Sequence, residues 1–279
     1  MMNKDKFTTQ SFFDAKQTGK KITMLTAYDY SMAQIVDDSG IDSILVGDSL
    51  GMVMQGNKST LKVTMEDMVY HSRCVSRGVH RALIVADLPF LSYQVNSEDA
   101  IRNAGRLIQE GSADAVKLEG GQRMVQTVQA VVNAQIPVMG HIGLTPQSIN
   151  IMGGFKVQGK ETAAAQKLID DAMALEQAGV FSIVLEAVPE KLAQIITERV
   201  KVPTIGIGAG RYCDGQILVV NDVLGMYSDF TPKFVKKYAD LKTSITKALN
   251  NYATEVQNGQ FPEKKHTFKI DETVLEKLY

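Results

Sequence analysis

The sequence contains no tryptophan and only two cysteines, and none of its apolar runs approaches the length of a membrane span. A span takes about 20 consecutive apolar residues, and the N-terminal segment lacks the unbroken apolar core of a signal peptide. The cysteines, Cys74 and Cys213, lie far apart and form no CxxC or metal-type cluster, so no disulfide framework is expected. These absences predict a cytoplasmic protein with free thiols and no membrane partner.

Neither sign of charge is in excess, because 30 lysines and arginines stand against 31 aspartates and glutamates. Proteins that bind nucleic acids through phosphate contacts carry a clear basic excess. We therefore expect small-molecule substrates and no nucleic-acid partner. With 279 residues, of which 44% are apolar, the chain suits one large domain or two small ones.

Short apolar runs recur along the chain, and each is followed by a segment with helical spacing. Near-continuous apolar runs are typical of parallel strands that are covered on both faces. Strands are predicted over residues 22–27, 43–47, 82–86, 115–118, 137–140, 181–185 and 203–207, with an eighth inside 216–225. Helices are predicted over residues 30–39, 63–78, 98–110, 122–134, 163–179 and 190–200.

Eight such units in about 250 residues favour a (β/α)8 TIM barrel over an open doubly wound sheet. No linker or change of composition interrupts the repeats, so residues 1–279 are expected to form a single barrel domain. Apolar residues at three-to-four spacing predict one extra C-terminal amphipathic helix over residues 234–256. Residues 259–279 are expected to be a tail.

Polar side chains stand where five of the predicted strands end, and a barrel builds its active site at that end. A single strand-end acid is more often a helix cap or a solvated loop residue, but six residues on one barrel indicate a site. They are Asp48, Asp87, Lys117, Glu119, His141 and Glu186.

Four carboxylates beside one ammonium group require a compensating cation. Mg²⁺ meets this need, because it takes oxygen ligands from one or two carboxylates and keeps positions for water and substrate. Asp48 and Asp87 are the predicted ligands. Zinc is less suited, since His141 is the single nitrogen candidate at these strand ends.

A 2-keto acid could chelate such a metal, which would stabilise the enolate formed when the neighbouring carbon loses a proton. The reaction needs a base on another strand, and Glu186 is the candidate. Lys117 could hold the substrate carboxylate or the developing oxyanion. The loop over residues 48–64 is a candidate lid, with an ordered wall of the cavity as the alternative.

Several stretches resemble the ketopantoate hydroxymethyltransferase family, in the same order, from about residue 21 to about 268. The most specific are LVGDSLGMVMQG at 45–56 and GHIGLTPQSINIMGGFKVQG at 140–159. The resemblance implies a (β/α)8 barrel of the phosphoenolpyruvate/pyruvate superfamily. It implies transfer of a hydroxymethyl group from 5,10-methylenetetrahydrofolate to 3-methyl-2-oxobutanoate through a Mg-stabilised enolate, on the route to pantothenate and coenzyme A.

The resemblance also carries residue roles. It implies one Mg²⁺ per subunit on Asp48 and Asp87, with Glu119 close to the metal through water. The proton acceptor falls on Glu186. It implies large homo-oligomers, commonly decamers, while residues 269–279 extend past the usual ending of the family. The implied substrate contacts are Asp48, Ser49, Asp87, Lys117 and His141.

Three other hypotheses about the function remain open on the sequence alone. A Schiff-base aldolase would use Lys117 as its nucleophile. A metal-dependent lyase of the same superfamily, acting on a 2-hydroxy or 2-methyl dicarboxylic acid, would share the metal and the carboxylates. A non-catalytic keto-acid-binding protein would bind the substrate without exchanging its proton.

Overall fold

Eight parallel strands close into a barrel in the order of the chain, with β8 pairing with β1. The computed structural model describes residues 6–226 and 232–278. The (β/α)8 prediction is confirmed, and the eighth strand lies at the start of the segment in which it was expected. The strands are β1 (Ile22–Thr26), β2 (Ser43–Val46), β3 (Leu83–Asp87), β4 (Ala115–Glu119), β5 (Val138–Gly143), β6 (Ser182–Glu186), β7 (Thr204–Ile207) and β8 (Gly215–Leu218).

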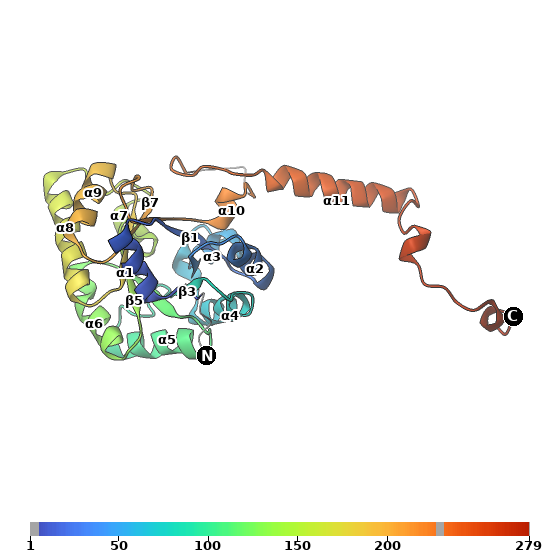
Figure 1. The fold of residues 1–279 in the computed structure, drawn as a ribbon, viewed down its shortest axis with the longest axis horizontal. Coiled ribbons are helices and arrows are strands. Elements are labelled where there is room, and N and C mark those ends of the chain that lie inside the picture. The colour runs from blue at the N-terminus through green and yellow to red at the C-terminus, as the bar shows by residue number, and fades with distance from the viewer. Residues whose placement is uncertain (1–5, 227–231, 279) are drawn as a thin grey trace. The chain divides into compact units, whose positions relative to one another are not determined.

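Helices surround the strands (Figure 1). None of the helices in the described ranges is long and apolar enough to cross a membrane. The helices around the barrel are α1 (Thr9–Thr18), α2 (Tyr30–Asp38), α3 (Leu50–Val53), α4 (Met65–Ser76), α5 (Ser97–Gln109), α6 (Val125–Asn133), α7 (Ile149–Met152), α8 (Thr162–Gln177) and α9 (Glu190–Arg199). Short 3₁₀ turns are η1 (Thr60–Lys62), η2 (Gln122–Met124) and η3 (Pro146–Ser148).

The contacts within the chain divide it into two units. The first comprises Met1–Val220 with Pro232–Val235 and contains the barrel. The second comprises Asn221–Thr231 with Lys236–Tyr279. α10 (Val220–Val223) lies at the boundary in the sequence, and the second unit contains α11 (Leu241–Gln257), η4 (Lys264–His266) and α12 (Glu272–Leu275).

The prediction of one helix over residues 234–256 is wrong at its beginning. α11 begins at Leu241, where the side chain of Asp240 accepts a hydrogen bond from the backbone N–H of Thr243. Before it, the N–H of Tyr238 donates to the carbonyl of Val223. Apolar spacing continues through the segment before α11, and the cap, not the spacing, decides where the helix starts.

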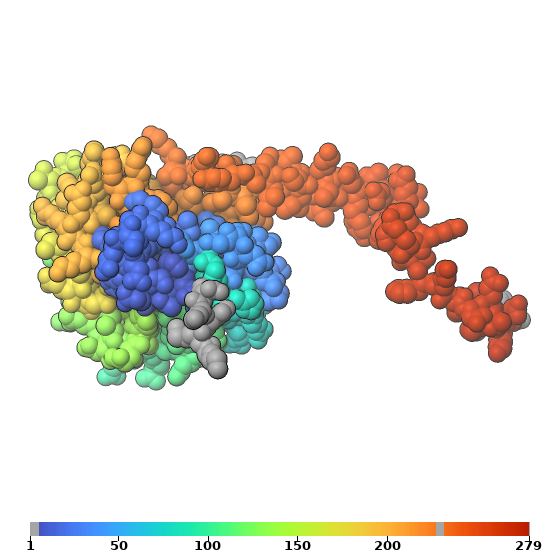
Figure 2. All heavy atoms as spheres, viewed as in Figure 1, coloured from blue at the N-terminus to red at the C-terminus, as the bar shows by residue number. Residues whose placement is uncertain are grey.

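Helix α1 was not predicted, and it closes the N-terminal end of the barrel. Its Phe12 is fully buried in the barrel core, and its ring meets that of Phe181 edge to face at 5.2 Å between centroids. In Figure 2, dark-blue N-terminal residues lie across the face of the barrel unit that is turned to the viewer. Because this end is plugged, the opposite end, where the strands finish, is left for a site.

The loop over residues 48–64 folds as part of the wall. It contains α3 and η1, and Leu50, Thr60 and Val63 in it are buried. A Cβ on Gly51 would lie 2.6 Å from Cγ2 of Val63, so the Gly51 backbone packs directly against the Val63 side chain. This packing favours the ordered wall over the lid.

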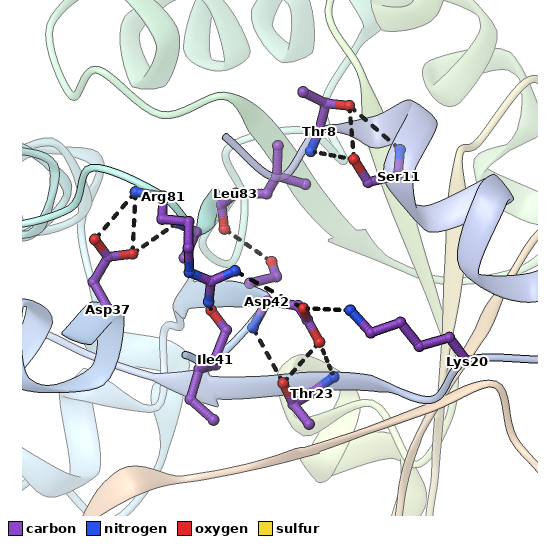
Figure 3. A network of polar contacts seen from close by, with 11 residues as sticks. Thr8, Ser11, Lys20, Thr23, Asp37, Ile41, Asp42, Arg81 and Leu83 are labelled. Carbon is purple, nitrogen blue, oxygen red and sulfur yellow. Dashed lines mark hydrogen bonds and ion pairs between the residues drawn. The ribbon is translucent and has the colours of Figure 1, made fainter. Parts of the chain in front are cut away.

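A polar network joins the elements at the N-terminal end of the barrel (Figure 3). Asp42 accepts hydrogen bonds from the backbone and the hydroxyl of Thr23, at 3.0 and 2.8 Å, and pairs with Lys20 at 3.4 Å. The guanidinium of Arg81 donates to the carbonyl of Ile41. These bonds tie the start of β1 to the segments that lead into β2 and β3.

Asp37, at the end of α2, belongs to the same network. Its buried carboxylate accepts hydrogen bonds from the backbone N–H groups of His80, Arg81 and Ala82, at 2.7 to 3.2 Å. Burial by itself would raise the pKa of Asp37, but these donors and the Arg81 guanidinium lower it below its usual value. The charged carboxylate therefore stabilises the folded state.

Replacing Asp37 with asparagine is expected to lower the free energy of unfolding by about 2 kcal/mol at pH 7, because a charge-assisted acceptor is lost. The folded pKa is depressed, so this contribution is present above about pH 4 and is lost as the pH falls through the folded pKa. Urea unfolding of both proteins at pH 7 and at pH 3 checks this. The difference in the free energy of unfolding between wild type and Asp37→Asn should be smaller at pH 3 than at pH 7. Asp38→Asn, at an exposed neighbouring position, should show no difference from the wild type at either pH. An equal difference for Asp37→Asn at both pH values would contradict the assignment.

Candidate active site

The six strand-end residues meet at the carboxyl end of the barrel. Within β4, Lys117 and Glu119 are two positions apart and so share one face of the strand. The register pairs Asp87 with Lys117, and Glu119 with His141. Glu186 closes β6 opposite Gly143. Neighbouring parallel strands in this register bring side chains that are far apart in the sequence into one cluster.

The centre of the cluster is an ion pair between Lys117 and Asp87. Its Nζ and Oδ1 atoms are 2.7 Å apart, and both side chains are buried. The other oxygen of Asp87 accepts the backbone N–H of Asp48 at 3.0 Å. Burial by itself would lower the pKa of Lys117, but the carboxylates of Asp87, Glu119 and Asp48 raise it above its usual value. Lys117 is therefore an ammonium group.

His141 connects this pair to Glu186. Its Nε2 lies 3.1 Å from Oε2 of Glu186, and its Nδ1 lies 3.5 Å from Oε1 of Glu119 and 3.3 Å from Nζ of Lys117. Burial and the Lys117 charge lower the pKa of His141, but the hydrogen bonds to the two glutamates outweigh them and raise it to about 9. Glu186 is the most accessible of this group, with 14% of its side chain exposed.

The cluster has an excess of negative charge. Burial, followed by the charges of Asp87 and Glu119, raises the pKa of Asp48 well above its usual value. Burial likewise raises the pKa of Asp87. When all members are ionised, four carboxylates face two cations, so a divalent cation would neutralise the cluster. The carboxylates are those of Asp48, Asp87, Glu119 and Glu186, and the cations are Lys117 and His141.

As they stand, no three His, Cys, Asp or Glu side chains in the described part of the chain are placed to hold a metal ion. Mg²⁺, however, is commonly held by one or two carboxylates, with water and substrate completing its octahedron. The buried carboxylates of Asp48 and Asp87, joined through the Asp48 N–H, offer such a pair. Their oxygen chemistry and the uncompensated charge fit a hard divalent cation.

Ser49 borders the cluster and is held by an aromatic neighbour. Its hydroxyl lies 2.8 Å from the hydroxyl of Tyr28. A Cβ on Gly47 would come within 2.8 Å of Ser49 Oγ and 3.5 Å of Asp87 Oδ2. Glycine at this position leaves room for the Ser49 hydroxyl.

Two buried residues of the site, Tyr93 and Gln147, were missed by the sequence reasoning. They lie in the loops after β3 and β5 and not at strand ends, so the strand-end rule does not reach them. The Tyr93 hydroxyl donates to Gln147 Oε1 at 2.7 Å, and Gln147 Nε2 donates to Asp48 Oδ2 at 2.9 Å. The GHIGLTPQS stretch, which contains Gln147, was the available signal.

Comparison with known proteins gives the family. The family model described as ketopantoate hydroxymethyltransferase matches residues 6–264. The chain belongs to this family. It is an enzyme that transfers a hydroxymethyl group to 3-methyl-2-oxobutanoate, a branched 2-keto acid.

Relatives within the ketopantoate hydroxymethyltransferase family match over nearly the full chain. A 3-methyl-2-oxobutanoate hydroxymethyltransferase of Clostridium beijerinckii is 61% identical over 98% of this chain and 100% of its own length. The protein of the same name from Clostridium novyi is 62% identical over the same shares. Identity this high over the whole barrel confirms the resemblance that the motifs indicated.

Solved structures support the fold. A phosphonopyruvate hydrolase in complex with oxalate and Mg²⁺ superposes with a TM-score of 0.61 at 12% identity, covering 96% of this chain and 93% of its own. A 2,3-dimethylmalate lyase, a member of the PEP mutase/isocitrate lyase superfamily, superposes with a TM-score of 0.60 at 15% identity, covering 93% and 91%. At such low identity the likeness concerns the barrel alone.

Proposed function

We propose that Glu186 is the base that removes the proton from the branched carbon of 3-methyl-2-oxobutanoate. The observation that carries this is its position: Glu186 lies 3.1 Å from His141 at the more open side of the carboxylate cluster. A general base must reach the substrate, so it is expected at the accessible side of the site, whereas the groups that stabilise the developing charge can stay buried. His141, charged and paired with Glu186, orients that carboxylate beside the substrate.

Lys117 and Ser49 are proposed substrate contacts together with Asp48, Asp87 and His141. The Lys117 ammonium lies in the buried centre of the site, where a fixed positive charge stabilises a developing oxyanion much more strongly than in water. Its charged state makes it a poor nucleophile, which speaks against the Schiff-base aldolase. Ser49, held by Tyr28, offers a hydroxyl at the rim.

We further propose that Asp48 and Asp87 hold Mg²⁺, with Glu119 contributing through water. When bound, Mg²⁺ would supply Lewis-acid polarisation of the keto group. The one-carbon donor is proposed to be 5,10-methylenetetrahydrofolate. A carbon–carbon bond forms between the deprotonated carbon and the donated methylene, both carbon–nitrogen bonds of that methylene break, and water supplies the hydroxyl. The proton taken from the substrate and the second proton of water go to the two nitrogens, and tetrahydrofolate leaves.

Exchange of the branched-carbon proton separates enolisation from transfer. In deuterated water, ¹H NMR of 3-methyl-2-oxobutanoate is expected to show exchange with enzyme and Mg²⁺ alone, whereas ketopantoate appears only after the folate is added. Chelation by EDTA should slow exchange by about 100-fold or more, since Lewis-acid catalysis contributes several kcal/mol. Heat-inactivated enzyme is the control, and exchange that EDTA leaves unchanged would contradict the proposed metal.

The same experiment distinguishes the remaining alternatives. A non-catalytic binding protein would bind the keto acid without exchanging its proton. A lyase would cleave a 2-hydroxy or 2-methyl dicarboxylic acid and would not depend on folate.

We also propose that the chain acts as a homo-oligomer, with a decamer as the expected size. α11 has no buried residue, and one stripe of it is apolar and exposed. Ile245, Leu249, Tyr252 and Val256 form this stripe at helical spacing, with Leu249 61% exposed. Such a face is typical of a subunit contact.

Replacing Leu249 with glutamate is expected to weaken assembly by about 2 kcal/mol per contact, or about 30-fold in the dissociation constant, because a charge enters an apolar interface. Sedimentation velocity across a dilution series measures this. Asn251→Glu places the same charge elsewhere on the same helix and should sediment like the wild type. If Leu249→Glu sediments like the wild type at every dilution, the stripe is not part of the subunit interface.

The cytoplasm is the proposed compartment. Both cysteines are unpaired, and Cys213 is buried. Burial raises the pKa of the Cys213 thiol, which lowers its reactivity, and unpaired cysteines are typical of a reducing compartment. Cell fractionation with an antibody to the chain tests this.

A further inference from the structure

Gln147 does not lie at the end of a strand, but it contacts two carboxylates of the cluster. It lies in η3, after β5, and is 5% exposed. Its side-chain Nε2 donates to Asp48 Oδ2 and to the carbonyl of Leu88, both at 2.9 Å. Its backbone N–H donates to Glu119 Oε2 at 3.0 Å. One neutral residue thus holds an oxygen on each of two carboxylates.

The orientation of the Gln147 amide is decided by its neighbours. A tyrosine hydroxyl is protonated at neutral pH, and the Tyr93 hydroxyl, which accepts the N–H of Glu119 at 3.0 Å, donates to Gln147 Oε1 at 2.7 Å. Gln94 Nε2 donates to the same oxygen at 3.1 Å. Reversing the amide would turn its carbonyl toward a carboxylate and its NH₂ toward two donors. All four hydrogen-bonding positions of the amide are therefore used.

The contacts select one oxygen of each carboxylate. Gln147 takes Oδ2 of Asp48 and Oε2 of Glu119, so the oxygens that it does not hold are Oδ1 of Asp48 and Oε1 of Glu119. Because the amide is uncharged, it donates without adding a third cation that would compete for the carboxylates. A lysine at the same place would neutralise the charge that a divalent cation requires.

We propose that Gln147 is a positioning residue, which through the Tyr93–Gln147–Asp48 chain of hydrogen bonds orients Asp48 and Glu119 for a divalent cation. The inference rests on the proposed function, since it assumes that these carboxylates serve a cation. Groups that orient metal ligands commonly contribute 10- to 100-fold to metal affinity. Gln147 supplies this orientation from the loop after β5, whereas Asp48 follows β2 and Glu119 ends β4.

The test measures Mn²⁺ binding to the full chain without substrate, by the electron paramagnetic resonance of free Mn²⁺. Gln147→Met keeps the length of the side chain but removes the donors, and is expected to weaken binding by about 10- to 100-fold. Tyr93→Phe removes the hydroxyl that orients the amide and that also accepts the backbone N–H of Glu119, and a weakening of a few fold is expected. Raising the Mn²⁺ concentration should restore proton exchange in both variants.

Thr197→Val is the matched structural control. It removes a buried hydroxyl, 2.7 Å from that of Thr204, at the other end of the barrel. It should lower the melting temperature and leave Mn²⁺ binding within about twofold of the wild type. If Gln147→Met fails to fold, Tyr93→Phe alone decides the question.

Three results would overturn the inference. Unchanged Mn²⁺ binding in Gln147→Met or, where that variant does not fold, in Tyr93→Phe would show that the amide does not orient the ligands. Equally weakened Mn²⁺ binding in Thr197→Val would show that the effect of Gln147→Met comes from a general loss of stability. Absence of Mn²⁺ binding by the wild type would overturn the proposed metal site and this inference with it, whereas wild-type binding with unaffected variants would overturn the inference alone.

Discussion

Glu186→Gln is expected to lower kcat by about 10²- to 10⁴-fold, because the amide keeps the shape of the side chain but cannot accept the substrate proton. Exchange of the branched-carbon proton should fall by the same factor, since both rates depend on the same proton transfer. Binding of 3-methyl-2-oxobutanoate should change little. ¹H NMR of the exchange, together with steady-state kinetics of ketopantoate formation, measures both.

Glu190→Gln is the matched control for this prediction. Glu190 lies only four positions later, at the start of α9, but is accessible and pairs with Arg211 at 3.2 Å outside the cluster. It should retain wild-type exchange. Normal exchange by Glu186→Gln would assign the base to another residue, and a loss of ketopantoate formation with exchange intact would move the role of Glu186 to the transfer step.

Lys117→Met is expected to remove both activity and stability. The buried carboxylate of Asp87 would lose the ammonium group 2.7 Å away, and breaking one side of a buried ion pair costs about 3 to 5 kcal/mol. The fixed charge that faces the oxyanion would also be lost, for a further decrease in kcat of about 10²- to 10³-fold. Urea unfolding and steady-state kinetics give the two quantities separately.

Lys16→Met separates these effects. Lys16 pairs with Asp214 at 2.8 Å, and both side chains are largely buried, but the pair lies by α1, away from the strand ends. Its loss should lower stability and leave kcat near the wild-type value. Near-normal turnover by Lys117→Met would refute its role, and a borohydride-trapped adduct at Lys117 in the wild type would support the Schiff-base aldolase instead.

The strands and most helices could be predicted from the sequence because their signals are local. A buried parallel strand needs an apolar run, and a helix needs periodic apolar residues between caps. Helix α1 was missed because its burial depends on Phe12 meeting Phe181, a contact between residues that are distant in the chain. The start of α11 was misplaced because the apolar spacing continues beyond the helix on its N-terminal side.

The sequence by itself determined where the acids stand, because the end of a strand is a local property and a barrel gathers all such ends at one rim. Asp48, Asp87, Lys117, Glu119, His141 and Glu186 could therefore be named in advance. Only the tertiary structure decided which oxygens of Asp48 and Glu119 accept hydrogen bonds from the loop after β5. That choice depends on Gln147, which reaches Asp48 across 99 positions of sequence. The positions of hydrogen-bond partners so distant in the chain follow from the closure of the barrel and from no pattern of neighbouring residues.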